Sequence, residues 1–94
     1  MSSEKLNVSV VLLTKNEEHN IDACLGSCSF AKEIIVVDDE STDGTVAKAK
    51  TFGAKVFTRA LAGNWGEQQT FAISKASYDW VFLIDADERV SPLL

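Results

Sequence analysis

Short apolar runs alternate along this chain with segments in which apolar residues recur at helical spacing. Four runs rich in β-branched and aromatic residues predict strands at residues 8–13, 33–37, 54–57 and 79–84. Apolar residues three or four positions apart predict helices at about residues 16–29, 45–52 and 67–76. The alternation predicts an α/β fold, a Rossmann-like, mostly parallel sheet of about four strands with helices on both faces. We expect residues 1–94 to form a single domain.

Individual residues refine these expectations. Residues 80–84 are apolar without interruption, which predicts a strand covered on both faces. The third run is short and contains Lys55, so we expect that strand near an edge of the sheet. Asn16 is a candidate cap for the first helix, and Gly53 is expected to end the second. Trp65 is expected either to line a sugar or acceptor pocket or to cover a face of the sheet.

Acidic residues follow two of the predicted strands. Asp38 and Asp39 come after the second run, and Asp85 and Asp87 after the fourth. The carboxyl ends of parallel strands share one edge of the sheet, where open α/β sheets bind their ligands. Asp85 and Asp87 point the same way in an extended chain and suit a hard cation such as Mg²⁺ or Mn²⁺. Asp38 and Asp39 suit hydrogen bonds from a nucleoside, although helix capping is an alternative role for acids at these positions.

Composition excludes several classes of protein. The formal charge is −5 and no basic cluster is present, which argues against a nucleic-acid surface. The first strand–helix turn lacks the glycine pattern of dinucleotide-binding folds, and a P-loop is absent. Cys24 and Cys28 have no partners for a zinc site and are expected in the core. No apolar run approaches 18 residues and no leader is recognisable, so we expect a cytoplasmic protein without a membrane span.

Three ordered segments resemble the family 2 glycosyltransferases of the GT-A fold. They are VSVVLLTKNEE at residues 8–18, IIVVDDESTDGT at 34–45 and FLIDADE at 82–88. The closest similarity is to the branch that builds the bacterial lipopolysaccharide core. The resemblance implies a nucleotide-diphosphate sugar as donor, with UDP as the expected nucleotide. It also implies these substrate-binding residues: Thr14, Asn16, Glu17, Asp38, Asp39 and Asp85.

The resemblance further implies a divalent metal, Mg²⁺ or Mn²⁺, held by Asp85 and Asp87, with Asp87 as the principal ligand. The acceptor would be a saccharide or a glycolipid, and the protein could act in the cytoplasm or peripherally at the inner membrane. Two positions depart from the family pattern. Glu40 stands where glycine is common, and Gln68 and Gln69 stand where a basic residue often approaches the nucleotide.

Members of this family continue well beyond the metal motif into a half that supplies the acceptor site and a catalytic carboxylate. This chain stops at Leu94. We therefore expect the N-terminal, nucleotide-binding part of a GT-A fold, which by itself is inactive, lacks the catalytic base and self-associates through exposed sheet surface.

Three alternatives remain at this point. A phospho-acceptor receiver domain is also a small doubly wound sheet, but its acid pair follows the first strand, and here the pair follows the second. A haloacid-dehalogenase-type phosphatase places its Asp-x-Asp after the first strand, whereas here it follows the fourth. A nucleotide-holding module without catalysis is the third alternative.

Overall fold

The computed structural model describes residues 5–86, and these form one parallel four-stranded sheet. The strand order is β3-β2-β1-β4, with all pairs parallel. The strands are β1 (Leu6–Thr14), β2 (Ala31–Asp38), β3 (Lys55–Thr58) and β4 (Trp80–Asp85). The predicted α/β fold is confirmed, and so is the position of β3 at an edge.

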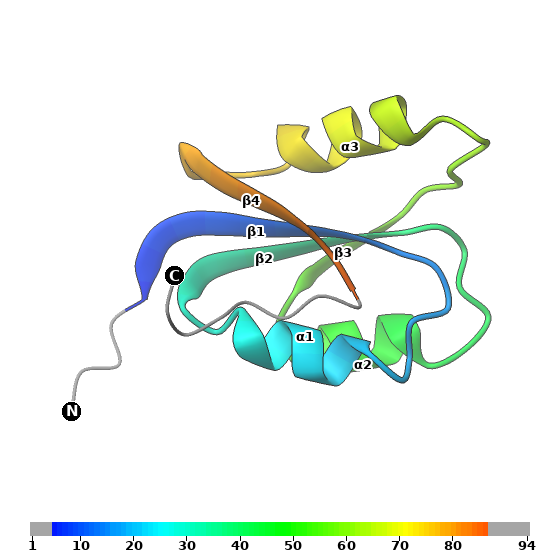
Figure 1. The fold of residues 1–94 in the computed structure, drawn as a ribbon, viewed down its shortest axis with the longest axis horizontal. Helices are drawn as coiled ribbons and strands as arrows, with labels where there is room; N and C mark the ends of the chain where they lie inside the picture. Colours follow the sequence, from blue (N-terminus) through cyan, green and yellow to red (C-terminus); the bar gives the residue numbers. More distant parts are fainter. Residues whose placement is uncertain (1–4, 87–94) are drawn as a thin grey trace.

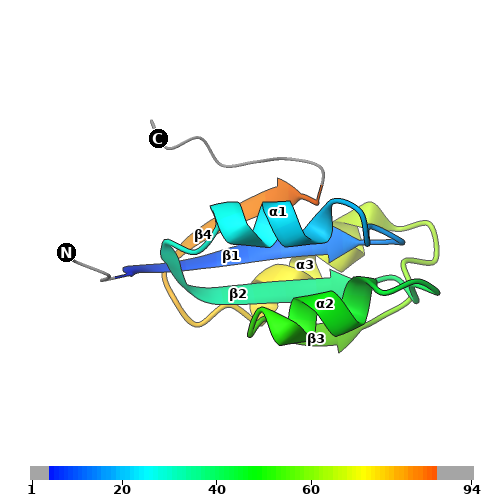
Figure 2. The same cartoon turned by 90° about the horizontal axis from the view of Figure 1, so that it is seen from below.

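Helices cover both faces of the sheet, as predicted. The helices α1 (Ile21–Ser27) and α2 (Thr45–Thr51) lie on one face, and α3 (Trp65–Ser74) lies on the other (Figures 1 and 2). Among residues 5–86, no helix is long and apolar enough to cross a membrane.

The two central strands are largely apolar because each contributes to two cores. Alternate residues of β1, such as Val10 and Leu12, pack with Ile21 and Leu25 under α1 and α2. The intervening Val11 packs against the α3 side of the sheet. A strand with both faces covered needs this continuous apolar pattern.

The strand β4 is more exposed than its sequence predicts. It lies at an edge of the described sheet, and exposure reaches 70% for Trp80, 40% for Phe82 and 41% for Leu83. The prediction that this strand is covered on both faces is therefore wrong for residues 5–86. An apolar run shows that a segment favours burial, but it does not show whether a neighbouring strand is present to bury it.

Two helix starts also differ from prediction. The first helix begins at Ile21 with Asn20 as its N-cap, whereas Asn16 lies in the preceding loop with a φ of 51°. The third helix begins at Trp65, because the side chain of Asn64 accepts a hydrogen bond of 3.0 Å from the Glu67 amide. A capping side chain therefore marks the start of α3, whereas Asn20 makes no side-chain hydrogen bond at the start of α1.

A buried acid, Glu33, joins the strands near their amino-terminal ends, away from the carboxyl ends. The Glu33 carboxylate accepts hydrogen bonds from Ser9 Oγ at 2.6 Å, Lys55 Nζ at 2.6 Å and the Ser77 amide at 2.7 Å. Burial raises the pKa of Glu33, but the Lys55 ammonium and the other donors outweigh it and lower that pKa to about 2. Glu33 therefore links β1, β2, β3 and the segment that enters β4.

Candidate nucleotide-binding site

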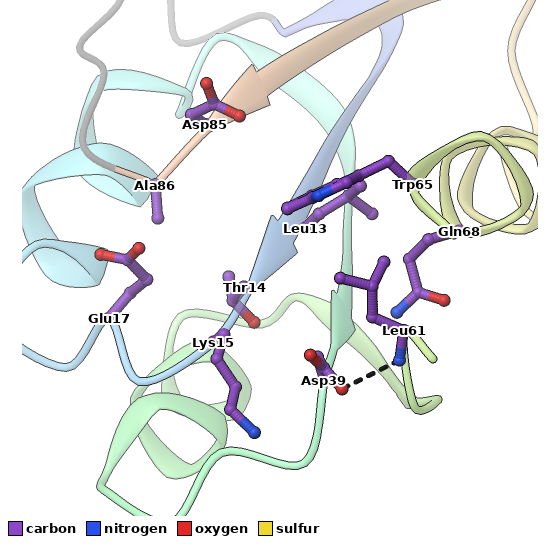
Figure 3. A pocket seen from close by; sticks show the side chains of 10 residues that line it. All are labelled: Leu13, Thr14, Lys15, Glu17, Asp39, Leu61, Trp65, Gln68, Asp85 and Ala86. Carbon is purple, nitrogen blue, oxygen red and sulfur yellow. Dashed lines mark hydrogen bonds between the residues drawn. The ribbon is translucent and has the colours of Figure 1, made fainter. Parts of the chain in front are cut away.

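A pocket of about 420 Å³ lies at the carboxyl edge of the sheet (Figure 3). Its wall comes from the ends of β1, β2 and β4, from the loop after β3 and from the start of α3. The lining residues are Leu13, Thr14, Lys15, Glu17, Asp39, Leu61, Trp65, Gln68, Asp85 and Ala86.

The two neighbouring acids at the end of β2 have different surroundings. Asp38 is fully buried, and its carboxylate accepts hydrogen bonds from Thr14 Oγ1 at 2.6 Å, Ser41 N at 2.7 Å and Ser41 Oγ at 2.6 Å. Asp39 is half-buried and borders the pocket. Because successive side chains of an extended chain point in opposite directions, one acid faces the interior and the next faces the ligand space.

Two other segments of the chain hold Asp39 in position. Its amide donates to the Thr14 carbonyl at 2.8 Å, which joins it to the end of β1. Its Oδ1 accepts a hydrogen bond of 2.9 Å from the Leu61 amide, in the loop between β3 and α3. Figure 3 shows this bond at the base of the pocket. Asp39 is therefore held through its backbone by β1 and through its carboxylate by the loop after β3.

The loops after β1 and β2 bind each other reciprocally. The Asn16 amide donates to Ser41 Oγ at 2.8 Å, and the Thr42 amide donates to Asn16 Oδ1 at 2.8 Å. The next amide, of Glu17, donates to Thr45 Oγ1 at 2.8 Å. Asn16 thus joins two loops that are separated by about 25 residues in sequence.

Asp43 and Glu18 extend this contact to the start of α2. Asp43 Oδ1 accepts hydrogen bonds from the hydroxyl and the amide of Thr45, and Oδ2 accepts one from the Glu18 amide. The Thr45 hydroxyl is the main reason that the pKa of Asp43 lies below its ordinary value. Glu18 Oε1 in turn accepts from the Gly44 amide at 3.0 Å. The acids of this loop pair therefore act mainly as hydrogen-bond acceptors for backbone amides.

Glu17 and Asp85 stand on other parts of the pocket wall. Glu17 is half-buried, and its Oε1 accepts a hydrogen bond of 3.2 Å from Asn20 Nδ2. Asp85 ends β4 and pairs in register with Leu13 of β1. Its carbonyl oxygen lies 3.7 Å from the Cys24 Sγ of α1, which anchors the end of the strand.

The end of β4 fits a hard divalent cation, because the Asp85 carboxylate offers the oxygen ligands that Mg²⁺ and Mn²⁺ prefer. Within residues 5–86, no three histidine, cysteine or acidic residues come together as a complete metal site. Asp87, the predicted principal ligand, lies outside the described residues. The metal roles of Asp85 and Asp87 thus remain predictions.

One contact of a pocket residue, that of Gln68 with Arg59, could not be found from sequence spacing. Gln68 is 1% exposed, and its Oε1 accepts a hydrogen bond of 2.7 Å from Arg59 Nη1. Its Nε2 donates to the Arg59 carbonyl at 2.6 Å, and the Arg59 guanidinium lies 5.0 Å from the centre of the Phe71 ring. Gln68 therefore attaches the first turn of α3 to the loop that follows β3. Gln69, its neighbour, is exposed and does not line the pocket.

The structure separates the predicted substrate-binding residues into two groups. Thr14, Glu17, Asp39 and Asp85 line one pocket although they come from three different strand ends. Asn16 and Asp38 do not line it, and their side chains bind neighbouring parts of the protein.

Comparison with known sequences identifies the family of this chain. The family described as glycosyl transferase family 2 matches residues 9–94. An uncharacterized glycosyltransferase of Rickettsia typhi is 48% identical over 85 residues, which cover 89% of this chain and 29% of that protein. The lipopolysaccharide core biosynthesis glycosyltransferase LpsC of Rhizobium meliloti is 36% identical over 94 residues, covering 96% of this chain and 35% of LpsC. The chain thus spans about a third of the length of these relatives.

Solved structures agree with this assignment. Residues 1–349 of S. aureus TarS superpose with a TM-score of 0.80 at 26% identity, covering 92% of this chain and 29% of that TarS chain. Glucosyl-3-phosphoglycerate synthase of Mycobacterium tuberculosis, in complex with Mn²⁺, UDP and glucosyl-3-phosphoglycerate, gives a TM-score of 0.73 at 32% identity. That match covers 85% of this chain and 33% of the synthase. The matches confirm the predicted GT-A type of fold and favour a transferase over the receiver-domain and phosphatase alternatives.

Proposed function

Because this chain belongs to glycosyl transferase family 2, we propose that it binds a nucleotide-diphosphate sugar, with UDP as the nucleotide, at the carboxyl edge of its sheet. The observation that carries this proposal is the convergence of Glu17, Asp39 and Asp85 on one pocket from three separate strand ends. Such an edge is where open α/β sheets bind nucleotides. The M. tuberculosis synthase that resembles this chain was crystallised with UDP and Mn²⁺, which supports the choice of ligand.

Asp39 is the residue proposed to hold the nucleoside. An ionised carboxylate offers about four lone-pair sites, and the Leu61 amide uses one of them. The remaining sites suit the N–H of a base or the hydroxyls of a ribose. Thr14 and Asp38 contribute as positioning residues in this proposal, because they hold the backbone that carries Asp39.

Asp85, together with Asp87, is proposed to hold Mg²⁺ or Mn²⁺ beside the diphosphate. When bound, such a cation neutralises charge on the departing nucleotide diphosphate. Glu17 and Asp39 both line the pocket, so an unaccompanied diphosphate would meet negative charge there. Lys15 also lines the pocket and can contribute a positive charge to the phosphates. The residues of this chain therefore bind and orient the donor.

The proposed acceptor is a saccharide or a glycolipid, modified in the cytoplasm or at the inner face of the inner membrane. The resemblance to LpsC supports this class of acceptor. An inverting transfer needs a carboxylate that takes the acceptor's proton. Asp39 and Asp85 are engaged with the donor in this proposal, so we infer that the base comes from outside residues 5–86. We expect this chain alone to bind donor without turnover.

Calorimetry with UDP, GDP and ADP, each with and without Mn²⁺, tests the proposal. We expect UDP to bind most tightly, and only when the metal is present. Asp85→Asn and Asp87→Asn should each remove the dependence on metal. Asp79→Asn is the matched control, because it removes the same charge from an exposed residue at the other end of β4. Equal binding of UDP with and without metal would refute the metal role, and tighter binding of GDP would refute the choice of nucleotide.

A further inference from the structure

Trp65 is an exposed aromatic residue in a pocket that is also lined by the acidic residues Glu17, Asp39 and Asp85. It lines the pocket, yet 58% of its surface remains accessible. Figure 3 shows its indole extending from α3 into the pocket, on the same side as Leu61 and Gln68 and across from Glu17 and Ala86. An indole that covered the sheet would be buried against it. Trp65 therefore presents its ring to the ligand space.

A series of hydrogen bonds ties the start of α3 to Asp39. Asp39 Oδ1 accepts from the Leu61 amide at 2.9 Å, and the Leu61 carbonyl accepts from the Asn64 amide at 3.0 Å. Asn64 Oδ1 then accepts from the Glu67 amide at 3.0 Å and caps the helix that begins at Trp65. The backbone of Trp65 and the carboxylate of Asp39 are thus held by one continuous local structure.

Two further features fix this geometry. The turn between Leu61 and Asn64 has positive φ angles at Ala62 (53°) and Gly63 (76°), which reverse the chain sharply. One turn of helix after Trp65, the paired hydrogen bonds between Gln68 and Arg59 attach α3 to the preceding loop. The indole is therefore carried by a helix end with hydrogen bonds on both sides.

We propose that the base of the nucleotide stacks on the indole of Trp65 while its edge is hydrogen-bonded to Asp39. This inference rests on the proposed function and adds a residue that determines donor affinity. A planar base held at its edge by a carboxylate leaves two faces to be covered, and base–aromatic stacking covers a face without regard to base identity. Leu13 and Leu61 add apolar surface to the pocket wall that Trp65 shares with them. A neutral base is also the part of the ligand least repelled by the surrounding acids.

The chain contains two tryptophans, which allows a direct fluorescence test. Trp80→Phe leaves Trp65 as the reporter, and Trp65→Phe leaves Trp80, which lies at the start of β4 away from the pocket. The probes are uridine, ribose 5-phosphate, glucose and UDP, the last in the presence of Mg²⁺. Mg²⁺ replaces Mn²⁺ in this assay because Mn²⁺ is paramagnetic and quenches tryptophan emission by itself. We expect uridine and UDP to quench Trp65 emission, and neither to change Trp80 emission. Ribose 5-phosphate and glucose should leave both signals unchanged.

Calorimetry in parallel separates this inference from the proposed function. Trp65→Ala should weaken UDP binding by about 5- to 150-fold, the range for removal of one base–aromatic stack. Trp65→Phe keeps a smaller ring and should lose less than Trp65→Ala. If UDP binds the unaltered chain but Trp65→Ala binds it equally well and uridine gives no quenching, the stacking role is wrong and the proposed function stands. Quenching by glucose in place of uridine would overturn the assignment to the base. Failure of UDP to bind the unaltered chain would overturn both proposals.

Discussion

Replacing Glu33 by glutamine should destabilise the fold in a pH-dependent way. The substitution keeps the shape of the side chain but removes the charge that faces Lys55 Nζ at 2.6 Å. It also puts N–H donors where Ser9, Lys55 and Ser77 already donate. Glu33 links three strands and the segment that enters the fourth. Removing its charge should therefore lower the free energy of unfolding of the whole domain.

The magnitude follows from the pKa of Glu33, which falls from 4.5 to about 2 on folding. Each pKa unit corresponds to about 1.36 kcal/mol, so the ionised carboxylate contributes about 3 kcal/mol at neutral pH. Because the folded-state pKa is the lower one, this stability is fully present above pH 4.5 and is lost as the pH falls toward 2. At pH 3, about 1.4 kcal/mol of it should remain.

Urea unfolding at pH 7, 4 and 3, followed by circular dichroism, measures this difference. We expect Glu33→Gln to be less stable than the unaltered protein by about 3 kcal/mol at pH 7 and by clearly less at pH 3. Glu67→Gln is the control, because Glu67 is exposed and lies 4.0 Å from Arg59 in a surface ion pair. Its effect should be small at every pH.

A difference between the unaltered protein and Glu33→Gln that stays constant from pH 7 to pH 3 would refute this reasoning. The Glu33 carboxylate would then act through shape and hydrogen bonding alone, and its charge would contribute nothing. If Glu33→Gln lost as little stability at pH 7 as Glu67→Gln does, the contact between Glu33 and Lys55 would be screened by solvent.

Two further predictions concern the strand ends and the sheet edge. Asp38→Ala should lower the free energy of unfolding by about 2–4 kcal/mol, because it leaves the buried hydroxyl of Thr14 and the half-buried donors of Ser41 without their acceptor. Denaturant titration would contradict this if the free energy of unfolding fell by no more than about 0.5 kcal/mol. Lysines in place of Trp80 and Phe82 should reduce self-association, since exposed apolar residues on an edge strand favour pairing between molecules. Sedimentation at increasing concentration checks this, and an unaltered protein that stays monomeric throughout would show that the edge does not associate.

Sequence predicted the fold well where local pattern and burial agree. The runs that form β1 and β2 are apolar because both of their faces are covered, and the apolar pattern predicts this burial directly. The run of β4 has the same composition, but its exposure depends on whether another strand lies beside it, which no local pattern encodes.

The site was predictable in its location but less so in its details. Acids after two of the predicted strands indicated the correct edge, because parallel strands end together. The different roles of Asp38 and Asp39 depend on Thr14 and Ser41, whose side chains meet Asp38 only in the folded chain. The contact of Gln68 with Arg59 across nine residues is likewise a product of the fold.

The reciprocal bonds between the loops after β1 and β2 have a consequence for how a ligand would be received. The amides of Asn16, Glu17 and Glu18 lie near the surface, yet each donates to a side chain of the loop after β2 or of the first residue of α2. Such amides should exchange their hydrogens with water far more slowly than their position suggests. This wall of the pocket is therefore preorganised, and little conformational entropy is left to lose there on binding. The residues that lose conformational freedom on binding are instead exposed side chains such as Lys15 and Trp65.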